Sequence, residues 1–337
     1  MNPFWNSGEK RLRALLRIGL QLLLFLLFAL GLVFIMSDLL LPLIPENSPL
    51  VQIQIRSNFL FGELTSPLIA LGATLLSMFL AGRFLDRRPF RDFGFHRDQG
   101  WWKDFFIGLG IGALVMAMIF LVEMTLGWVR VSGFFTPKSG NPFWLGVVVD
   151  LVTFICVGVY EEMLFRGYIQ RNLMEGLNLR WLTPRTAVIL ATILTSIIFS
   201  ILHLMNPGAS LMSFLNIFLA GIFLSLGFIL TGELALPIGL HIAWNFFQGA
   251  VFGFPVSGVS AVSPFISIEQ VNSGWMTGGI FGPEAGGIGI LAMLLGAALI
   301  LLWVKKSRGS IRLWEELAVY QPSNRETKTP PVPLEQI

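Results

Sequence analysis

Two adjacent glutamates and an arginine stand at the end of a long apolar run. Residues 160–167 read YEEMLFRG, directly after LGVVVDLVTFICVGV at 145–159. An ionisable side chain at the centre of a bilayer costs about 2.5–3.5 kcal/mol on insertion scales. Glu162 and Arg166 are four residues apart with the acid first, which is the favoured spacing for an ion pair on a helix. Glu161 is turned about 100° away from this pair, so its carboxylate is left over as a candidate functional group.

Two of the three histidines lie in later apolar runs of the same region. The stretch FSILH ends at His203 and places it on one helical face with Phe199, and HIAWN does the same for His241 and Asn245. A hydrogen bond between helices is the usual explanation for one such histidine. A carboxylate, two imidazoles and an amide on three successive helices favour a functional site instead, because these side chains can transfer protons and bind ligands.

These motifs resemble those of a known family. EEMLFR fits Glu-Glu-x-x-x-Arg, FSILH fits Phe-x-x-x-His and HIAWN fits His-x-x-x-Asn, in that order and without departure at the motif residues. The chain is similar to the CAAX protease and bacteriocin-processing (CPBP or Abi) family of intramembrane endopeptidases, which includes the eukaryotic type II CAAX prenyl endopeptidase. The resemblance covers about a third of the chain, and the flanking helices contribute only topology.

The resemblance implies a role for each motif residue. Glu161 would be the general base that activates water, assisted by His203, and His241 and Asn245 would hold the oxyanion of the tetrahedral intermediate. Peptide hydrolysis needs a base poised near neutral pH and fixed donors where negative charge develops, so the chemistry is compatible with these residue types. The supporting residues would be Glu162, Arg166 and Phe199.

The sequence leaves the participation of a metal open. Glu161, His203 and His241 could hold a zinc ion with one position left for water. The chain contains no His-Glu-x-x-His, an asparagine amide is a poor zinc ligand, and Glu162 would then be the nearby candidate for the base. The favoured hypothesis needs no cofactor, with zinc as the alternative.

Two further functions remain as alternatives to the endopeptidase. One is a non-catalytic membrane binding or bacteriocin-immunity protein that retains the motifs. The other is a small transporter, because polar residues near the midplane also mark ion pathways. The sequence shows no inverted repeat that would favour the transporter.

The composition indicates what kind of protein positions these residues. Hydrophobic residues make up 54% of the chain and charged residues 13%, whereas soluble domains carry about 25% charged residues. The mean hydropathy is +0.73. Apolar runs of about 20 residues, long enough to span a bilayer, predict an all-α polytopic membrane protein with about eight transmembrane helices. They lie at 14–36, 64–84, 105–127, 143–165, 186–204, 211–230, 234–253 and 286–304.

The basic residues predict the orientation. If both termini are cytoplasmic, all but three of the 23 lysines and arginines fall on the inner side, the exceptions being Arg56, Arg130 and Lys138. This bias is what the positive-inside rule requires, and it is lost if one span is added or removed. We therefore expect a multi-pass protein of the bacterial plasma membrane, acting on a membrane-associated or lipid-tethered peptide or protein. The net charge of +3 reflects these flanks and not nucleic-acid binding.

The polar residues also suggest the domain organisation. Polar side chains recur inside the helices of 143–253, which we interpret as the catalytic core, and the outer loop at 254–285 contains no lysine or arginine. The sole cysteine, Cys156, excludes an intramolecular disulfide and is interpreted as a buried apolar residue. The remaining segments are a cytoplasmic lead at 1–13, three accessory helices at 14–142, a last helix at 286–304 and a cytoplasmic, partly disordered tail at 305–337.

The predicted spans conflict on one point. They place Glu161 toward the inner end of its helix and His203 toward the outer end of the next. The two can meet only if a helix is shifted, so we expect the fourth helix to start nearer Asp150 and to run past Arg166. Pro207 is expected to stop the fifth helix soon after His203. Asp150 itself is interpreted as an interfacial residue.

Overall fold

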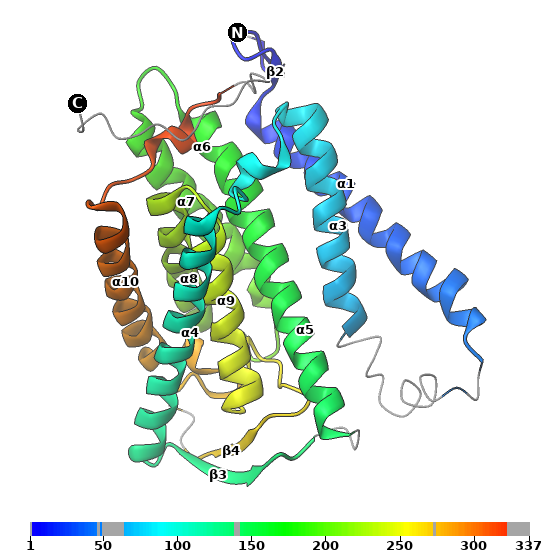
Figure 1. The fold of residues 1–337 in the computed structure, drawn as a ribbon, viewed down its shortest axis with the longest axis vertical. Coiled ribbons are helices and arrows are strands. Elements are labelled where there is room, and N and C mark those ends of the chain that lie inside the picture. Colours follow the sequence, from blue (N-terminus) through cyan, green and yellow to red (C-terminus); the bar gives the residue numbers. More distant parts are fainter. Residues whose placement is uncertain (1, 46–47, 49–63, 138–141, 272–273, 322–337) are drawn as a thin grey trace.

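Residues 2–45, 48, 64–137, 142–271 and 274–321 are described by the structure, a computed structural model. This part of the chain folds into eight helices, when adjoining α, π and 3-10 segments are counted together (Figure 1). Seven of them are long and apolar enough to cross a membrane, so the protein is a multi-pass integral membrane protein. The seven are α1 (Ala14–Phe34) with η1 (Ile35–Leu40), α3 (Ser66–Leu80) with η4 (Ala81–Asp86), α4 (Gln99–Thr125), α5 (Phe143–Glu162) with η6 (Met163–Gln170) and α6 (Arg171–Leu177), α7 (Pro184–Leu202) with η7 (His203–Met205), α8 (Leu211–Thr231) and α10 (Gly287–Arg308).

The eighth helix lies at the centre of the bundle. α9 (Ala235–Phe246) continues as η8 (Phe247–Val251), and all residues from Ala235 to Asn245 are buried. The predicted span at 234–253 is close to the observed helix, which ends at Val251 and is too short to count among the candidate spans. Neighbouring helices surround it, so this helix has little contact with lipid.

Small residues allow this central helix to approach its neighbours closely. A Cβ atom added at Gly108 of α4 would lie 2.3 Å from the carbonyl oxygen of Leu236. One added at Gly239 of α9 would lie 2.1 Å from the carbonyl oxygen of Phe105. Such close backbone approach is how helices associate in lipid, where dispersion replaces the hydrophobic effect. α9 is therefore held firmly against α4.

The two ends of the bundle carry different structures. The described segments nearest both termini lie at the same end (Figure 1), as an even number of helices requires. At the opposite end, β3 (Val129–Phe134) pairs in antiparallel fashion with β4 (Ile266–Gln270), a feature that the sequence did not predict. This pair joins the loop after α4 to the loop before α10. The cytoplasmic location of the termini stays a prediction.

A buried ionic cluster holds the termini end together. Arg17 of α1 lies 3.0 Å from Asp86 at the end of η4. Arg11 lies 2.6 Å and Arg17 3.2 Å from Glu175 of α6, and Arg88 pairs with the same carboxylate. Nearby are the short pair β1 (Trp5–Asn6) and β2 (Arg11–Leu12), η5 (Phe90–Phe93) and η11 (Glu315–Ala318). Part of the predicted disordered tail, 322–337, lies outside the described residues.

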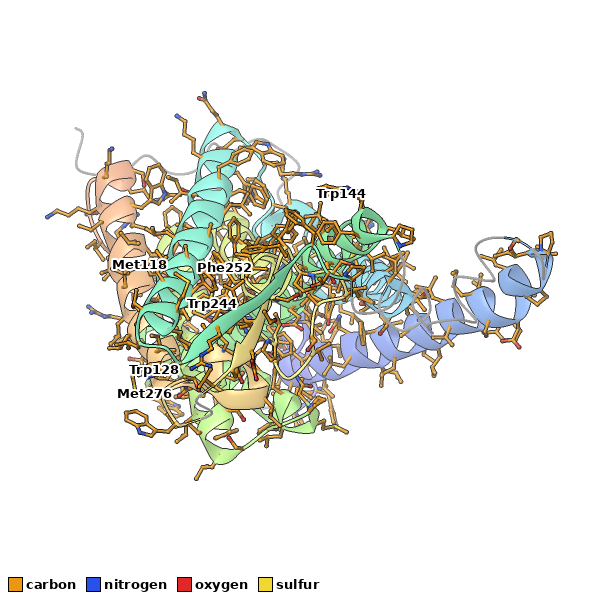
Figure 2. All side chains as sticks on the ribbon, turned by 90° about the horizontal axis from the view of Figure 1, so that it is seen from below. Met118, Trp128, Trp144, Trp244, Phe252 and Met276 are labelled. Atoms are coloured by element: carbon orange, nitrogen blue, oxygen red, sulfur yellow. The ribbon has the colours of Figure 1, made fainter. Side chains whose placement is uncertain are left out.

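Apolar side chains cover the outer surface of the bundle (Figure 2). Trp144 at the start of α5 is 66% exposed and lies at the end that carries β3, as does Trp128. Tryptophan is enriched at membrane interfaces. α1 leans away from the other helices (Figure 1), and its exposed leucines suit contact with lipid. Cys156 is buried in α5 at 3% exposure.

Candidate active site

One continuous helix carries both glutamates. It runs through α5, η6 and α6 from Phe143 to Leu177, a length of 35 residues. The expectation that this helix starts nearer Asp150 was wrong, whereas it does continue past Arg166. Glu161 therefore lies near the middle of this helix because the helix is longer than predicted, and not because it is shifted. Its π-helical part begins directly after the glutamates, and such widened turns are frequent at functional sites.

Glu162 and Arg166 form the ion pair that their spacing predicts. Arg166 Nη1 lies 3.0 Å from Glu162 Oε1, and the two side chains are 1% and 0% exposed. Arg166 Nη2 also donates to the carbonyl oxygen of Gly221 on α8 at 3.0 Å. The guanidinium carbon lies 4.7 Å from the centre of the Phe199 ring on α7. This pair therefore connects α5, α7 and α8.

His241 of α9 lies between the two glutamates. Its Nδ1 is 2.8 Å from Glu162 Oε1, and its Nε2 is 3.9 Å from Glu161 Oε2. The Tyr160 hydroxyl donates to Glu161 Oε1 at 3.2 Å. The close packing of α9 against α4, and of Ile242 against Gly158 of α5, fixes the imidazole at this depth. The structure thus brings Glu161 to an imidazole, and the nearer one is His241.

His203 begins the 3-10 turn that ends the α7 segment. Its Nδ1 lies 2.8 Å from the carbonyl oxygen of Phe199, and the two rings are 4.5 Å apart. A carbonyl oxygen only accepts, so Nδ1 carries the proton and Nε2 of the neutral ring is free to accept one. The helical segment ends at Met205, before Pro207, as the sequence predicts.

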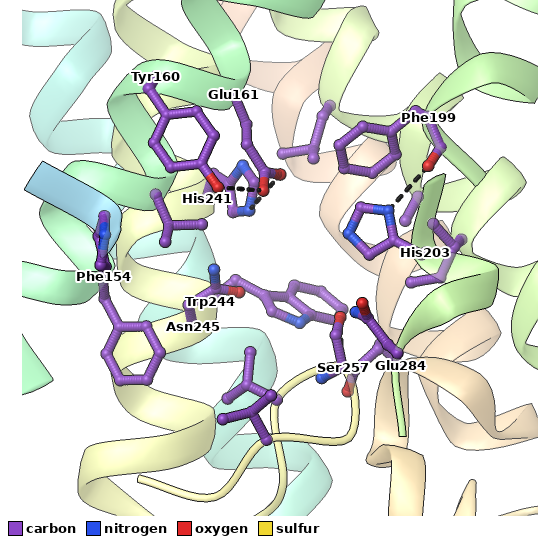
Figure 3. A pocket seen from close by; sticks show the side chains of 18 of the residues that line it. Phe154, Tyr160, Glu161, Phe199, His203, His241, Trp244, Asn245, Ser257 and Glu284 are labelled. Atoms are coloured by element: carbon purple, nitrogen blue, oxygen red, sulfur yellow. Dashed lines mark hydrogen bonds and ion pairs between the residues drawn. The ribbon is translucent and has the colours of Figure 1, made fainter. Parts of the chain in front are cut away.

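All four predicted catalytic residues line one cavity. Its volume is about 550 Å³, and Glu161, His203, His241 and Asn245 contribute to its wall. Glu161 and His203 face each other across it, with Asn245 beyond them (Figure 3). The Asn245 side chain is 7% exposed and has no hydrogen-bond partner among the described residues. A buried amide without a partner, pointing into a cavity, is a group available to a ligand.

A comparison with known protein families matches the region that carries the motifs. Residues 142–247 match the family model of the type II CAAX prenyl endopeptidase Rce1-like proteins. The chain contains an Rce1-like domain. This family is one of intramembrane proteases, and its members act on protein substrates. No curated protein and no solved structure matches the chain.

The Rce1-like domain comprises α5 to α9. It supplies both glutamates, Arg166, both histidines and Asn245, since all of these lie within the matched residues. The first three spans, the loop after η8 and α10 lie outside it.

A metal ion is the alternative to metal-free chemistry in the Rce1-like site. Glu161, His203 and His241 are the candidate ligands, and each imidazole uses Nδ1 for a hydrogen bond to an oxygen, which leaves its Nε2 free for a ligand. No group of three His, Cys, Asp or Glu side chains in the described part of the chain is arranged to hold a metal. These side chains do not fit a zinc site in this arrangement.

Sequence reasoning missed several residues around the Rce1-like site. Asp150, interpreted from the sequence as interfacial, is 3% exposed and lines the cavity. Tyr160 was not predicted to be the hydrogen-bond partner of Glu161. Ser257 and Glu284, from the loop after the domain, also line the cavity (Figure 3). The available signal for Glu284 was a carboxylate in an otherwise apolar, glycine-rich stretch, FGPEAGG.

Proposed function

We propose that this protein is an intramembrane endopeptidase that hydrolyses a peptide bond with a water activated by Glu161. The observation that carries this proposal is the position of the Glu161 carboxylate, 3.9 Å from His241 Nε2, in the wall of a cavity shared with His203 and Asn245. A general base, a second proton acceptor and two candidate donors thus surround a space that a peptide and a water molecule can enter.

Glu161 is the proposed base because its carboxylate faces the cavity and is not committed to an arginine. Its partner Tyr160 donates one hydrogen bond, which leaves acceptor positions on the carboxylate for water. Across the cavity, His203 Nε2 can accept the second hydrogen of the same water. Two acceptors orient the oxygen lone pair of the water toward the substrate carbonyl, which is the geometry that general-base attack needs.

Asn245 and His241 are the proposed donors for the oxyanion. The Asn245 amide carries two N–H groups, and one of them can point at the developing charge. His241 Nδ1 already donates to Glu162, so its Nε2 can donate only in the doubly protonated ring. The Glu162 carboxylate, held by Arg166, stabilises that cation through a charge-assisted hydrogen bond. We therefore assign Glu162 to the orientation of His241.

The protons balance in this scheme. The water oxygen forms a bond to the carbonyl carbon, and its proton passes to Glu161. Collapse of the tetrahedral intermediate breaks the carbon–nitrogen bond, and the proton on Glu161 passes to the leaving amine. The products are a carboxylic acid and an amine, and Glu161 returns to its ionised form.

The substrate is proposed to be a membrane-associated or lipid-tethered protein or peptide. The cavity lies within the helical bundle, lined by residues of α5, α7, α8 and α9. A chain tethered to the bilayer reaches such a site with a high effective concentration, because tethering makes the encounter intramolecular.

The test compares the wild type with Glu161→Gln. Membranes expressing each protein are profiled for released peptides, and the purified proteins are assayed on any peptide found. We expect Glu161→Gln to reduce cleavage by at least about 100-fold, the usual contribution of a general base. Glu269→Gln, an exposed carboxylate on β4, is the control and is expected to cleave as the wild type does.

The alternatives give different results in the same comparison. A binding or immunity protein would keep its phenotype in Glu161→Gln, and a transporter would change its proton dependence. Equal cleavage by Glu161→Gln and the wild type would overturn the proposed base.

A further inference from the structure

The carbonyl oxygen of Gly221, which holds Arg166, is shared with a second side chain. Arg166 Nη2 lies 3.0 Å from this oxygen, and the hydroxyl oxygen of Ser225 lies 2.8 Å from it. Both side chains are buried, at 1% exposure each. Ser225 is also four residues after Gly221 in α8, so its backbone N–H donates to the same oxygen, as an α-helix requires. A carbonyl oxygen has two lone pairs, so only one remains for Arg166 or for the Ser225 hydroxyl.

Gln170 offers the Ser225 hydroxyl another acceptor. Its Oε1 lies 3.1 Å from Ser225 Oγ, and its Nε2 donates to the hydroxyl oxygen of Thr192 at 2.8 Å. The Thr192 hydroxyl donates its own hydrogen to the carbonyl oxygen of Val188, also at 2.8 Å. Thr192 therefore accepts from the amide nitrogen, and this contact turns the amide oxygen of Gln170 toward Ser225. A hydroxyl has one hydrogen, so a bond to Gln170 takes the Ser225 hydroxyl off the Gly221 oxygen.

The three side chains of Gln170, Thr192 and Ser225 form a polar chain behind the site. They come from η6, α7 and α8, and their exposures are 0%, 5% and 1%. A buried hydrogen that leaves one acceptor must find another protein acceptor, because water does not reach it. None of these three described side chains lines the cavity. They can therefore affect the reaction only through a residue that does, or through the partner of such a residue.

The bond from Arg166 to Gly221 bears on the proposed catalytic ring. A guanidinium is planar with its N–H groups in a fixed fork, so holding Nη2 on the Gly221 oxygen also sets the direction of Nη1. Arg166 Nη1 lies 3.0 Å from Glu162 Oε1, and that oxygen lies 2.8 Å from His241 Nδ1. The position of the guanidinium is thus passed to the His241 ring through one carboxylate.

We propose that Gln170 is a positioning residue of the peptidase site. By accepting the Ser225 hydroxyl, it leaves the carbonyl oxygen of Gly221 to Arg166. The fixed guanidinium then orients the His241 ring through the carboxylate between them. This inference rests on the proposed function and goes beyond it, because Gln170 lies outside the cavity.

Gln170→Met is the variant that tests this role, since methionine keeps an unbranched side chain and removes the hydrogen bonds. The hydroxyls of Thr192 and Ser225 keep backbone acceptors in this variant, so no buried donor is left without a partner and the fold is expected to persist. The Ser225 hydroxyl then competes with Arg166 for one lone pair. We expect kcat to fall about tenfold, which corresponds to about 1.4 kcal/mol. KM should stay at the wild-type value, because the change alters the catalytic ring and not the wall that binds substrate.

A double-mutant cycle shows whether this competition is the cause. Ser225→Ala removes the competing hydroxyl, so Gln170→Met should lower kcat less in the Ser225→Ala background than in the wild type. Thr192→Val removes the group that turns the Gln170 amide, and it should lower kcat in the same direction as Gln170→Met. Thr195→Val is the matched control on α7. The Thr195 hydroxyl is equally buried but has no hydrogen-bond partner among the described residues, so this variant should cleave as the wild type does.

The His241 ring gives a second readout that needs no substrate. The chain has three histidines, so labelling histidine with the heavy nitrogen isotope gives few ring signals in an NMR spectrum. The signal that is absent from His241→Gln belongs to His241. Its Nδ1 proton lies in a hydrogen bond to a carboxylate and is expected at low field. In Gln170→Met this signal should move to higher field, because the bond to Glu162 lengthens, and in Thr195→Val it should stay.

The two readouts separate this inference from the proposed function. If no peptide is cleaved, the peptidase fails, and the His241 signal alone decides whether Gln170 positions the ring. An unchanged signal in Gln170→Met overturns the inference, whether or not kcat falls. Where cleavage is seen, a shifted signal with unchanged kcat overturns it as well. The same holds for a loss of kcat that is as large in the Ser225→Ala background as in the wild type.

Discussion

Glu162, and not Glu161, is the carboxylate that holds the His241 ring: Oε1 of Glu162 lies 2.8 Å from Nδ1, whereas Oε2 of Glu161 lies 3.9 Å from Nε2. The same Glu162 oxygen receives Arg166 Nη1 at 3.0 Å. One buried carboxylate thus serves a structural ion pair and the orientation of a proposed catalytic ring. Glu161 remains free of the arginine and faces the cavity.

The double role of Glu162 predicts that stability and activity can be separated. Glu162→Leu leaves a buried guanidinium without its partner, which is expected to lower the free energy of unfolding by about 3–5 kcal/mol. The double variant Glu162→Leu with Arg166→Met removes both charges and is expected to recover most of that loss. Neither variant is expected to cleave, because His241 has lost its acceptor. Thermal unfolding in detergent and peptide cleavage measure the two effects. The single variant Arg166→Met completes the comparison, and a double variant that loses as much stability as Glu162→Leu and Arg166→Met together would contradict this account.

The contact between α4 and α9 predicts an effect of a single methyl group far from the chemistry. Gly108→Ala places a Cβ atom 2.3 Å from the carbonyl oxygen of Leu236. Overpacking of this kind costs about 1–3 kcal/mol, and it displaces the helix that carries His241, so cleavage should decrease as well. Gly110→Ala, on the same helix with no atom within 4 Å of the added Cβ, is the control. It should change stability by less than about 0.5 kcal/mol. A similar loss in both variants would point to the backbone of α4 and not to this contact.

Glu284 predicts a pH dependence of stability. Its pKa of about 7 is raised from 4.5 by burial, so the folded protein holds this proton more tightly than the unfolded chain does. The associated stability is fully present below about pH 4.5 and is lost as the pH rises through 7. Its full size is on the order of 3 kcal/mol. Melting temperatures measured between pH 4.5 and 8 should fall more steeply for the wild type than for Glu284→Gln. Parallel curves would show that Glu284 titrates normally.

The proposed mechanism predicts that chelation does not remove activity. Glu161 and the two imidazoles act as proton acceptors and donors in this scheme, and none of these steps needs a metal ion. The purified protein is dialysed exhaustively against a chelator and assayed with and without added zinc. Cleavage is expected to persist at the level of the untreated protein. Activity that is lost on chelation and restored by zinc would overturn the scheme and return Glu161, His203 and His241 to the role of ligands.

The orientation of the bundle gives a further prediction. Ser132 on β3 and Ser310 after α10 lie at opposite ends and are both exposed. In a background of Cys156→Ser, which removes the only cysteine, each is replaced by cysteine and intact cells are treated with a membrane-impermeant maleimide. With cytoplasmic termini, Ser132→Cys is labelled and Ser310→Cys is labelled only after lysis. The reverse pattern would show that the bundle is inserted the other way.

The sequence by itself determined the features that depend on local spacing and composition. Apolar runs predicted the membrane helices, since a helix in lipid must satisfy its own backbone hydrogen bonds. The four-residue spacing of Glu162 and Arg166 predicted their ion pair, because such residues lie on one face of a helix wherever that helix is placed. The order of the three motifs was enough to predict an Rce1-like domain.

Only the tertiary structure decided which groups meet. His241 is 79 residues from Glu162, and no local rule selects Glu162 over Glu161 as its partner; the packing of α9 against α4 and α5 does so. The same packing buries α9 along its length. Glu284 enters the cavity because the outer loop folds back onto Asp150, through backbone donors that any sequence could supply. Hydrogen bonds from the backbone and close contacts between helices leave no pattern in the sequence, and these contacts set the geometry of the site.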